Sequence, residues 1–234
     1  MRLKILASLF IATTLSGCAA VGVPLTLNPA SKLKSAEYLF DREDRPLPAE
    51  RLIMEAIETY KARGDNAGLA DAYRIYAHFL ISRAVTNWGK GYQNRGFIDK
   101  DVTFENRYRK ALEYCKKAIA LYEKESIYSW ASNVYLLIGK MQVTYFNNNQ
   151  MACENYTKAI ESHMLDRKKY PNQTYFQQPG FESFEEYVNA LKDDLGCPNG
   201  KLGEKIGVGG SWAAYATGAF TGLAGLGTII GGGG

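Results

Sequence analysis

An internal repeat restricts the fold of this chain more than any other feature of its sequence. When the sequence is shifted by 62 residues, residues 49–82 align with residues 111–144 without a gap. A third, partial copy follows 41 residues after the second and begins at Ala152. Self-similarity at a fixed period is typical of arrays in which each unit packs against its neighbours along the chain. The identical pairs in the first two copies are Ala49 and Ala111, Ala56 and Ala118, Ile57 and Ile119, Tyr60 and Tyr122, and Tyr73 and Tyr135.

The second and third copies each place a bulkier residue between two small ones at helical spacing. In the second copy these are Ala111, Cys115 and Ala118, at positions i, i+4 and i+7, which lie on one face of a helix. Small residues at both ends of this face let a neighbouring helix come close. Apolar positions recur at helical spacing along the chain, and no segment alternates as a strand would. We therefore expect an all-α fold with helices at about 31–42, 48–63, 66–86, 104–124, 127–146, 149–169 and 181–195.

The pattern resembles the second helix of a tetratricopeptide repeat (TPR), and Ala77 or Gly139 matches the small position of the first helix. The resemblance covers about residues 48–169. It implies a TPR-like α-solenoid of about two and a half repeats, within a helical domain at 31–197 that ends in a capping helix. The period of about 41 residues exceeds the 34 of that family, and its terminal Pro and Trp positions are not reproduced. An unrelated helical bundle is the alternative.

The same resemblance implies a binding surface. In TPR arrays the first helices of successive repeats line a concave groove, which receives an extended peptide or a helix of a partner. Asn133, Lys140 and Arg74 supply hydrogen-bond donors suited to a peptide backbone or a carboxylate. The alternative is that these are ordinary exposed helix residues. The groove-facing positions carried over from the family are Asp71, Arg74, His78 and Ile81 in one repeat and Asn133, Leu136, Lys140 and Val143 in the next.

Residues 87–104 interrupt the middle repeat. This segment is rich in glycine, aromatic and basic residues, among them Trp88, Tyr92 and Phe97. Two interpretations are open. The segment is either a binding loop beside the groove or an insertion that the neighbouring helices tolerate.

The beginning of the chain predicts export. Basic Arg2 and Lys4 precede an apolar run that ends at Leu15 and is too short to span a bilayer. The sequence Leu15-Ser16-Gly17-Cys18 resembles the lipobox of bacterial lipoproteins and matches it at every position. An ordinary cleaved signal with a chance cysteine is the alternative.

The lipobox resemblance implies a signal peptide at 1–17, acylation of Cys18 and a lipidated tether at 18–30. Several acyl chains on one residue, such as palmitate, anchor a protein far more firmly than a single chain does. Because Ala19 follows the cysteine, the resemblance also implies the outer membrane, with the domain facing the periplasm. Without the leader the net charge falls from +4 to about +2, so charge gives no reason to expect nucleic-acid binding.

Three cysteines remain after Cys18, which suggests one disulfide and one buried thiol in an oxidising compartment. If the last helix runs antiparallel to the helix at 149–169, Cys197 comes near Cys153. A disulfide between them would contribute roughly 3–4 kcal/mol. Cys115 occupies a position at which the repeat expects an inward apolar residue, so it is interpreted as part of the core.

Residues 198–234 form a Gly-rich apolar tail, which is uncharged from residue 206 onward. A stripe of small residues recurs every four positions, which suits close helix packing in a membrane. The tail is interpreted as a membrane contact or self-associating helix, as a disordered tail, or as a segment that docks back onto the helical domain. The stripe consists of Gly210, Ala214, Gly218 and Gly222.

The sequence contains no convincing active site, metal-ligand pattern or cofactor motif. Adjacent carboxylates such as Glu185 and Glu186 point apart on a helix, so they do not form an acid–base pair. The sequence therefore predicts a binding protein rather than an enzyme, namely a membrane-anchored adaptor for a protein or peptide partner in envelope assembly or secretion. The alternatives are an immunity-type lipoprotein that neutralises a periplasmic toxin and an accessory subunit of a solute transporter. The oligomeric state is left open.

Overall fold

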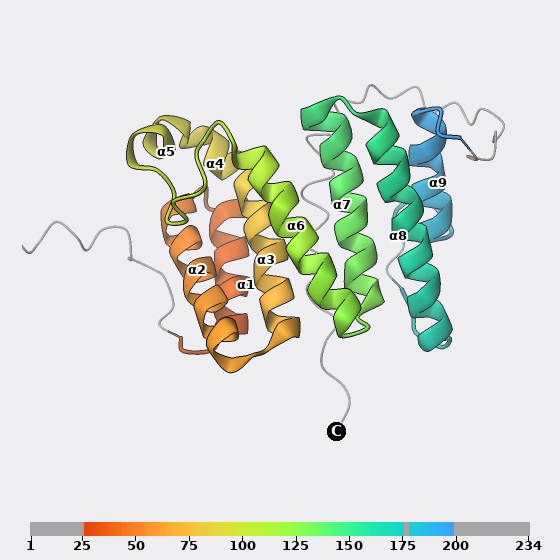
Figure 1. Ribbon diagram of the computed structural model, residues 1–234, viewed down its shortest axis with the longest axis horizontal. Helices are drawn as coiled ribbons and strands as arrows, with labels where there is room; N and C mark the ends of the chain where they lie inside the picture. Colours follow the sequence, from red (N-terminus) through yellow and green to blue (C-terminus); the bar gives the residue numbers. More distant parts are fainter. Residues whose placement is uncertain (1–25, 176–177, 199–234) are drawn as a thin grey trace, which may run out of the picture.

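The computed structural model describes residues 26–175 and 178–198, and these are helical with no strand (Figure 1). The expected all-α class is therefore confirmed. The helices in the described residues are α1 (Pro29–Asp41), α2 (Pro46–Arg63), α3 (Asn66–Ile81), α4 (Arg83–Asn87), α5 (Gly89–Arg95), α6 (Arg107–Lys124), α7 (Tyr128–Phe146), α8 (Asn149–Lys169) and α9 (Phe184–Asp194).

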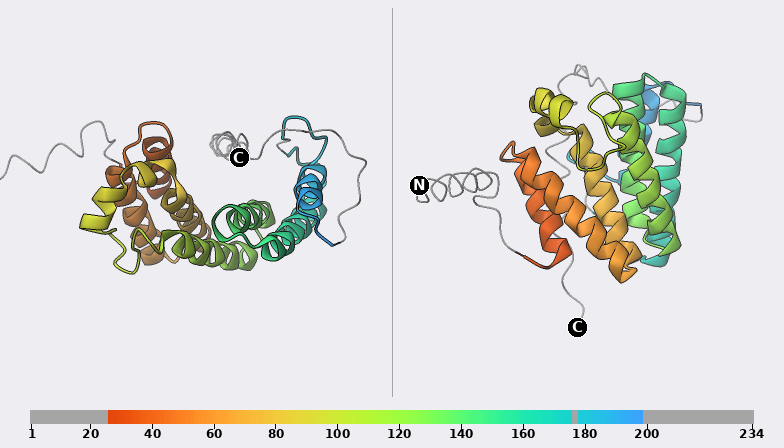
Figure 2. Two further views of the ribbon diagram at one scale, coloured as in Figure 1. Left: turned by 90° about the horizontal axis from the view of Figure 1, so that it is seen from above. Right: turned by 60° about the vertical axis from the view of Figure 1, so that its left-hand side comes forward.

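The long helices pair into antiparallel hairpins that follow one another along the chain. α1 packs on α2, α3 on α6 and α7 on α8, and each hairpin contacts the next through α2 with α3 and through α6 with α7. Seen from above, the helices form an arc, with α7 on its concave side and α6 and α8 on its convex side (Figure 2). The hairpins therefore bury their apolar faces mainly against their neighbours in sequence.

A proline in the first turn of each helix, together with a side-chain cap in α1, explains why the first two helices begin two residues earlier than the apolar spacing predicts. The side chain of Asn28 accepts hydrogen bonds from the N–H groups of Ala30 and Ser31, and Pro29 occupies the first turn, where its missing N–H costs nothing. α2 likewise begins at a proline, Pro46. It ends at Gly64, whose φ of 64° is a left-handed conformation that glycine adopts without strain.

The expected single helix at 66–86 is wrong, because the chain breaks at Ser82. This residue is extended, with ψ at 158°, and its Oγ accepts a hydrogen bond from the N–H of Val85. Ser82 thus ends α3 and caps α4. The break turns the chain away from the α3 axis and into the segment at 87–104.

The recurring small residues lie where the repeat pattern places them, at the contacts between helices. All six alanines of the three copies are fully buried. At Gly139 a Cβ atom would lie only 2.3 Å from Cε1 of Tyr156, so the α7–α8 contact leaves no room for alanine. These alanines are Ala49, Ala56, Ala111, Ala118, Ala152 and Ala159.

α9, the last helix among the described residues, closes the array against α8. The ammonium group of Lys192 donates a hydrogen bond to Oγ1 of Thr157, with 2.9 Å between them, and Tyr187 and Val188 are buried against α7 and α8. A disulfide joins Cys153 to Cys197, the pair that the sequence predicted, and Cys115 is a buried free thiol. Burial raises the pKa of Cys115 to about 12.

Candidate functional site

A cluster of charged side chains lies where α1, α3, α6 and α7 meet. Its centre is Arg74 of α3, whose guanidinium lies 3.6 Å from the carboxylate of Glu37 on α1 and 4.0 Å from that of Asp71, one turn earlier on α3. The guanidinium also lies over the ring of Trp130 on α7, with 4.7 Å to the ring centroid. Arg74 of α3 therefore contacts both α1 and α7.

Tyr122 of α6 completes this cluster, which we call the Arg74 cluster: Glu37, Asp41, Asp71, Arg74, Tyr122 and Trp130. The hydroxyl of Tyr122 donates a hydrogen bond to the carboxylate of Asp71. Asp71 belongs to the predicted groove, whereas Tyr122 matches the core position of Tyr60 in the repeat. The repeat pattern thus identifies the polar groups on α3 but not the residues that surround them.

The carboxylates of the cluster are held where their charge is poorly solvated. Burial, followed by repulsion from Glu37, raises the pKa of Asp41 to about 7. Burial also raises the pKa of Glu37, and the nearby Arg74 offsets part of that rise. Two carboxylates, those of Glu37 and Asp71, share the Arg74 guanidinium, and each of these three residues keeps part of its side chain accessible to solvent. The cluster is therefore a largely buried polar group that remains partly accessible to solvent.

The expectation that His78 and Leu136 face a partner is not met, because both side chains are buried. His78 is 5% exposed, since α1 covers it and the ring of Phe40 packs edge-on against it. Burial, assisted by the charge of Arg74, lowers the pKa of His78 to about 4. Leu136 is 7% exposed because it packs with Tyr187 of α9. The sequence comparison did not account for how α1 and α9 cover these positions.

The remaining predicted groove residues lie apart from the Arg74 cluster. Lys140 of α7 is partly buried, with its ammonium group 5.4 Å from the centroid of the Tyr187 ring on α9. Asn133, also on α7, is half-buried. The structure therefore brings together Asp71 and Arg74, whereas Lys140 belongs to the contact between α7 and α9.

The segment at 87–104 is fastened to the helices beneath it. Its rings of Tyr92 and Phe97 are buried and stacked, with 4.1 Å between their centroids. The carboxylate of Glu50 on α2 accepts a hydrogen bond of 2.7 Å from the N–H of Ile98. Burial raises the pKa of Glu50 to about 7, although this hydrogen bond opposes the rise. This packing favours the interpretation of an insertion that completes the core, while Trp88 and Ile98 stay partly exposed.

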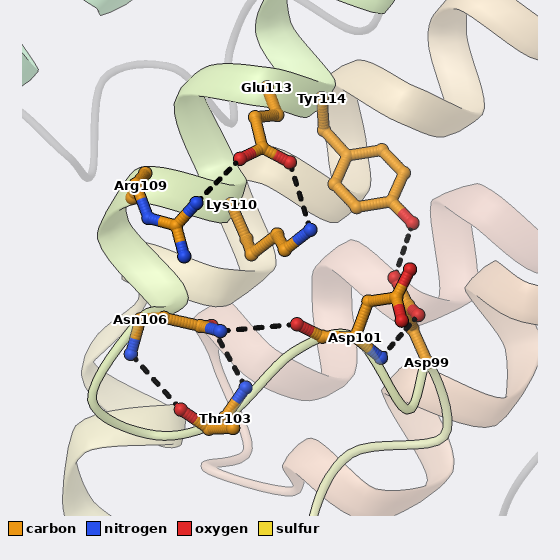
Figure 3. A network of polar contacts seen from close by, with 8 residues as sticks. All are labelled: Asp99, Asp101, Thr103, Asn106, Arg109, Lys110, Glu113 and Tyr114. Carbon is orange, nitrogen blue, oxygen red and sulfur yellow. Dashed lines mark hydrogen bonds and ion pairs between the residues drawn. The ribbon is translucent and has the colours of Figure 1, made fainter.

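A network of polar contacts ties the end of the insertion to α6 (Figure 3). The hydroxyl of Tyr114 donates to Asp99, with 2.6 Å between the oxygens. Asn106 and Thr103 exchange two hydrogen bonds between their backbone N–H groups and side-chain oxygens, and the Asn106 amide also donates to the Asp101 carbonyl. Such local side-chain bonds hold an irregular loop in one conformation. On α6 itself, Glu113 pairs with two cationic side chains of the preceding turn, Arg109 and Lys110.

A second polar cluster lies between α8 and α9. The Nε2 atom of His163 is 3.7 Å from Glu185, which also pairs with Arg167 at 3.1 Å. His163 stands where the repeat has Tyr122, and burial lowers its pKa. Asp166 accepts hydrogen bonds from the Ser129 N–H and from the Tyr175 hydroxyl, with 3.0 Å and 2.9 Å between the bonded atoms. These contacts dock α9 and its preceding loop onto α8. From the sequence, Glu185 was considered only together with Glu186, and its contacts with His163 and Arg167 were not predicted.

Several predicted sites lie outside the described residues. They are the lipidation site at Cys18, the signal peptide at 1–17, and the tail stripe of Gly210, Ala214, Gly218 and Gly222. Of the predicted tether, residues 26–30 are described, and α1 begins within them at Pro29.

Within residues 26–175 and 178–198, no three His, Cys, Asp or Glu side chains are grouped so that they would hold a metal ion. Among the same residues, no helix has the length and apolar character needed to cross a membrane. Comparisons of the chain with protein-family models, with curated proteins and with solved structures found no match.

Proposed function

We propose that this chain is an exported, lipid-anchored adaptor in which a TPR-like array of helical hairpins binds a protein or peptide partner through the Arg74 cluster. The ungapped repeat, the order of the hairpins and their arc support the TPR-like interpretation. The lipobox at residues 15–18 supports the anchor. The proposal assigns the chain to binding rather than to catalysis.

One observation carries the binding site. The repeat places Asn133 and Leu136 on α7 where α3 has Asp71 and Arg74. Because Leu136 is buried under α9, the same helical position tolerates an apolar side chain in the next hairpin. The fold therefore does not require charge at this position. Replacing a buried ionic group by an apolar one is often neutral or stabilising, so we attribute the charge at Arg74 to function.

The chemistry of the Arg74 cluster suits contact with a polypeptide. The guanidinium of Arg74 offers a planar set of donors, the carboxylates of Glu37 and Asp71 accept hydrogen bonds, and the ring of Trp130 provides an apolar surface beside them. Arginine and tryptophan are the residue types that most often dominate binding energy in protein interfaces. A partner segment laid across α1, α3 and α7 would meet all of these groups.

The test places the α7 residues at the equivalent positions of α3. The double variant Asp71→Asn/Arg74→Leu carries the residues that α7 uses at the equivalent positions, so it should fold. We expect crosslinking and affinity capture from envelope preparations to recover a partner with the wild-type protein and to lose it with this variant. The control is Lys116→Glu, an exposed change of charge on α6. Equal recovery by both variants would place the binding site elsewhere and overturn the assignment.

The anchor has its own test. We expect radiolabelled palmitate to be incorporated into the wild-type protein in cells and not into a Cys18→Ser variant. Incorporation into both proteins, or into neither, would contradict acylation of Cys18. The result does not depend on the Arg74 cluster, so the two parts of the proposal are tested separately.

A further inference from the structure

The order of the helices brings several helix termini together at one end of the structure, taken along the helix axes rather than around the arc. Because α1, α3 and α7 run antiparallel to α2, α6 and α8, the start of α1 and the end of α8 lie at this same end (Figure 1). Hydrogen bonds link neighbouring helix ends there. Lys169 donates to the carbonyl of Ser126 at 3.0 Å, and the Asn66 amide donates to Glu125 at 2.8 Å. We call this the tether end.

The last two turns of α8 expose apolar and basic side chains together at the tether end. Met164 is 58% exposed, Leu165 48% and Tyr170 45%. His163 and Asp166 face inward, which turns their neighbours outward, and Met164, Leu165 and Lys168 share one face of the helix. We call the group the α8 patch: Met164, Leu165, Arg167, Lys168, Lys169 and Tyr170. Glu161, one turn earlier, is the boundary of the patch.

The helix dipole explains only part of this composition. Basic residues near a helix C-terminus are favourable, and α2 and α6 also carry them in their last turns, at Lys61, Arg63 and Lys124. Neither of those ends carries a large hydrophobic side chain that is exposed, among the described residues. The exposed Met164 and Leu165 therefore distinguish the end of α8 from the ends of α2 and α6, and the helix dipole does not explain them.

The position of the predicted anchor supplies that reason. The described chain begins at Thr26, eight residues after Cys18, and a fully extended chain of that length spans at most about 29 Å. Leu27, at the base of α1, is 90% exposed. If Cys18 is acylated, as the proposed function states, the tether end is held close to the lipid headgroups. Large apolar side chains beside lysine and arginine are typical of surfaces that lie in a membrane interface.

We propose that the α8 patch contacts the surface of a membrane containing anionic lipid, and thereby orients the arc with its tether end toward the bilayer. This inference rests on the lipid anchor of the proposed function, but not on the Arg74 cluster. Met164, Leu165 and Tyr170 enter the headgroup region, while Lys168 approaches lipid phosphates. One acyl anchor and one weak basic patch act together, because the anchor keeps the patch at high effective concentration near the surface.

The experiment measures vesicle binding without the acyl group. The mature chain (residues 18–234) with Cys18→Ser is mixed with vesicles of phosphatidylglycerol and phosphatidylcholine, or of phosphatidylcholine alone, and sedimented. The test variant adds Met164→Ser, Leu165→Ser and Lys168→Glu. The matched control adds Phe146→Ser, Met151→Ser and Lys90→Glu, which change two exposed apolar residues and one charge at the opposite ends of the helices from the tether end. The thermal unfolding of each protein shows whether it is folded.

We expect the parent and the matched control to bind anionic vesicles alike, and the test variant to bind about tenfold or more weakly, since each basic residue near such a surface contributes about fivefold. Equal binding by the two variants would overturn the proposal and assign any affinity to another part of the chain. No binding by the parent would also overturn it. A parent that self-associates, with monomers recovered in the test variant, would make the patch an interface between copies. The palmitate result remains independent of all these outcomes.

Discussion

The hairpin of α3 and α6, here called the first, and the hairpin of α7 and α8, here called the second, carry the same repeat pattern, yet they differ at three places. The inner face of α3 is charged at Arg74, whereas α7 has Leu136 there. The chain between α3 and α6 contains an insertion, whereas α7 connects directly to α8. α9 and a disulfide close the second hairpin, whereas α1 packs against α3 in the first. The shared features specify the hairpin, and the differences give each hairpin its own inner face, connection and closure.

The small and the bulky positions of the repeat hold different residues in the two hairpins. The small position is Ala77 in α3 and Gly139 in α7, while the bulky position is Cys115 in α6 and Tyr156 in α8. A larger bulky residue thus accompanies a smaller small residue. Interiors are packed closely enough that one methyl group matters, so these two positions vary together rather than singly.

The largest expected effect removes the covalent closure of the second hairpin. The disulfide joins residues 44 positions apart, and the double variant Cys153→Ser/Cys197→Ser should lose about 3–4 kcal/mol of unfolding free energy. Denaturant titration measures this loss, and amide exchange should place it in α8 and α9 rather than in α3 and α6. Reduction of the wild-type protein should reproduce the variant. Equal stability before and after reduction would show that the disulfide does not support this hairpin.

The next largest effect is expected from exchanging alanine and glycine at the small position of the repeat. Gly139→Ala places a Cβ 2.3 Å from the Tyr156 ring, so we expect a loss of about 2 kcal/mol, net of the helix propensity that alanine gains. Ala77→Gly should cost about 1 kcal/mol from propensity. The double variant Gly139→Ala/Tyr156→Val should be more stable than the sum of its single changes implies, because the smaller side chain makes room for the methyl group. Strict additivity in denaturant titrations would refute the coupled packing.

We expect the unfolding free energy to depend on pH through Glu50, whose carboxylate binds the insertion at the N–H of Ile98. Burial raises the pKa of Glu50 to about 7 in the folded protein, so the folded state binds the proton more tightly than the unfolded state does. The contribution of Glu50 is therefore present below about pH 4.5 and is lost as pH rises to about 7, a change on the order of 2 kcal/mol.

Glu50→Gln should remove that dependence, and the repeat itself offers the comparison, since the equivalent residue in α6 is the uncharged Leu112. Unfolding free energies of both proteins between pH 4 and 8 measure the difference. His78, with its lowered pKa, changes stability in the opposite direction in both proteins and cancels. A difference that stays constant across this range would show that Glu50 does not titrate there.

The smallest expected effect concerns the charged inner face. Because α7 accommodates Asn133 and Leu136, the variant Asp71→Asn/Arg74→Leu should change the unfolding free energy by no more than about 1 kcal/mol. Thermal unfolding beside the wild-type protein measures this. Arg74→Leu alone should be less stable than the double variant, because Asp71 then keeps its charge without the guanidinium. A collapse of stability in the double variant would make the cluster a structural requirement of the first hairpin.

The sequence predicted the parts of the fold that depend on local periodicity. The bounds of α7 and α8 and the burial of the repeated alanines follow from spacing alone. The break at Ser82 was missed because α3 and α4 share one apolar period. Ser82 is, however, one of the residue types that favour the N-cap of a helix. The burial of Tyr92 and Phe97 was missed because a Gly-rich segment has no period from which burial can be inferred.

The candidate site was only half predictable for a different reason. Asp71 and Arg74 follow from the repeat register, since both lie one turn apart on the same helix. Their partners Glu37, Tyr122 and Trp130 come from three other helices, and periodicity within one helix carries no information about which neighbours converge. The burial of His78 depends on α1, which lies outside the repeat.

The buried thiol of Cys115 has a consequence for oxidative folding. Of the three cysteines that follow Cys18, Cys115 and Cys153 come first in the chain, and Cys197 last. In a chain that emerges N-terminus first, Cys115 and Cys153 are both available before Cys197, so the non-native pair could form before the native one. Packing of α6 against α3 resolves this competition, because a thiol with its pKa raised to about 12 forms almost no thiolate at neutral pH and does not attack a disulfide. If the first hairpin folds before the disulfide forms, Cys153 is left to react with Cys197, and the burial of Cys115 selects the covalent bond.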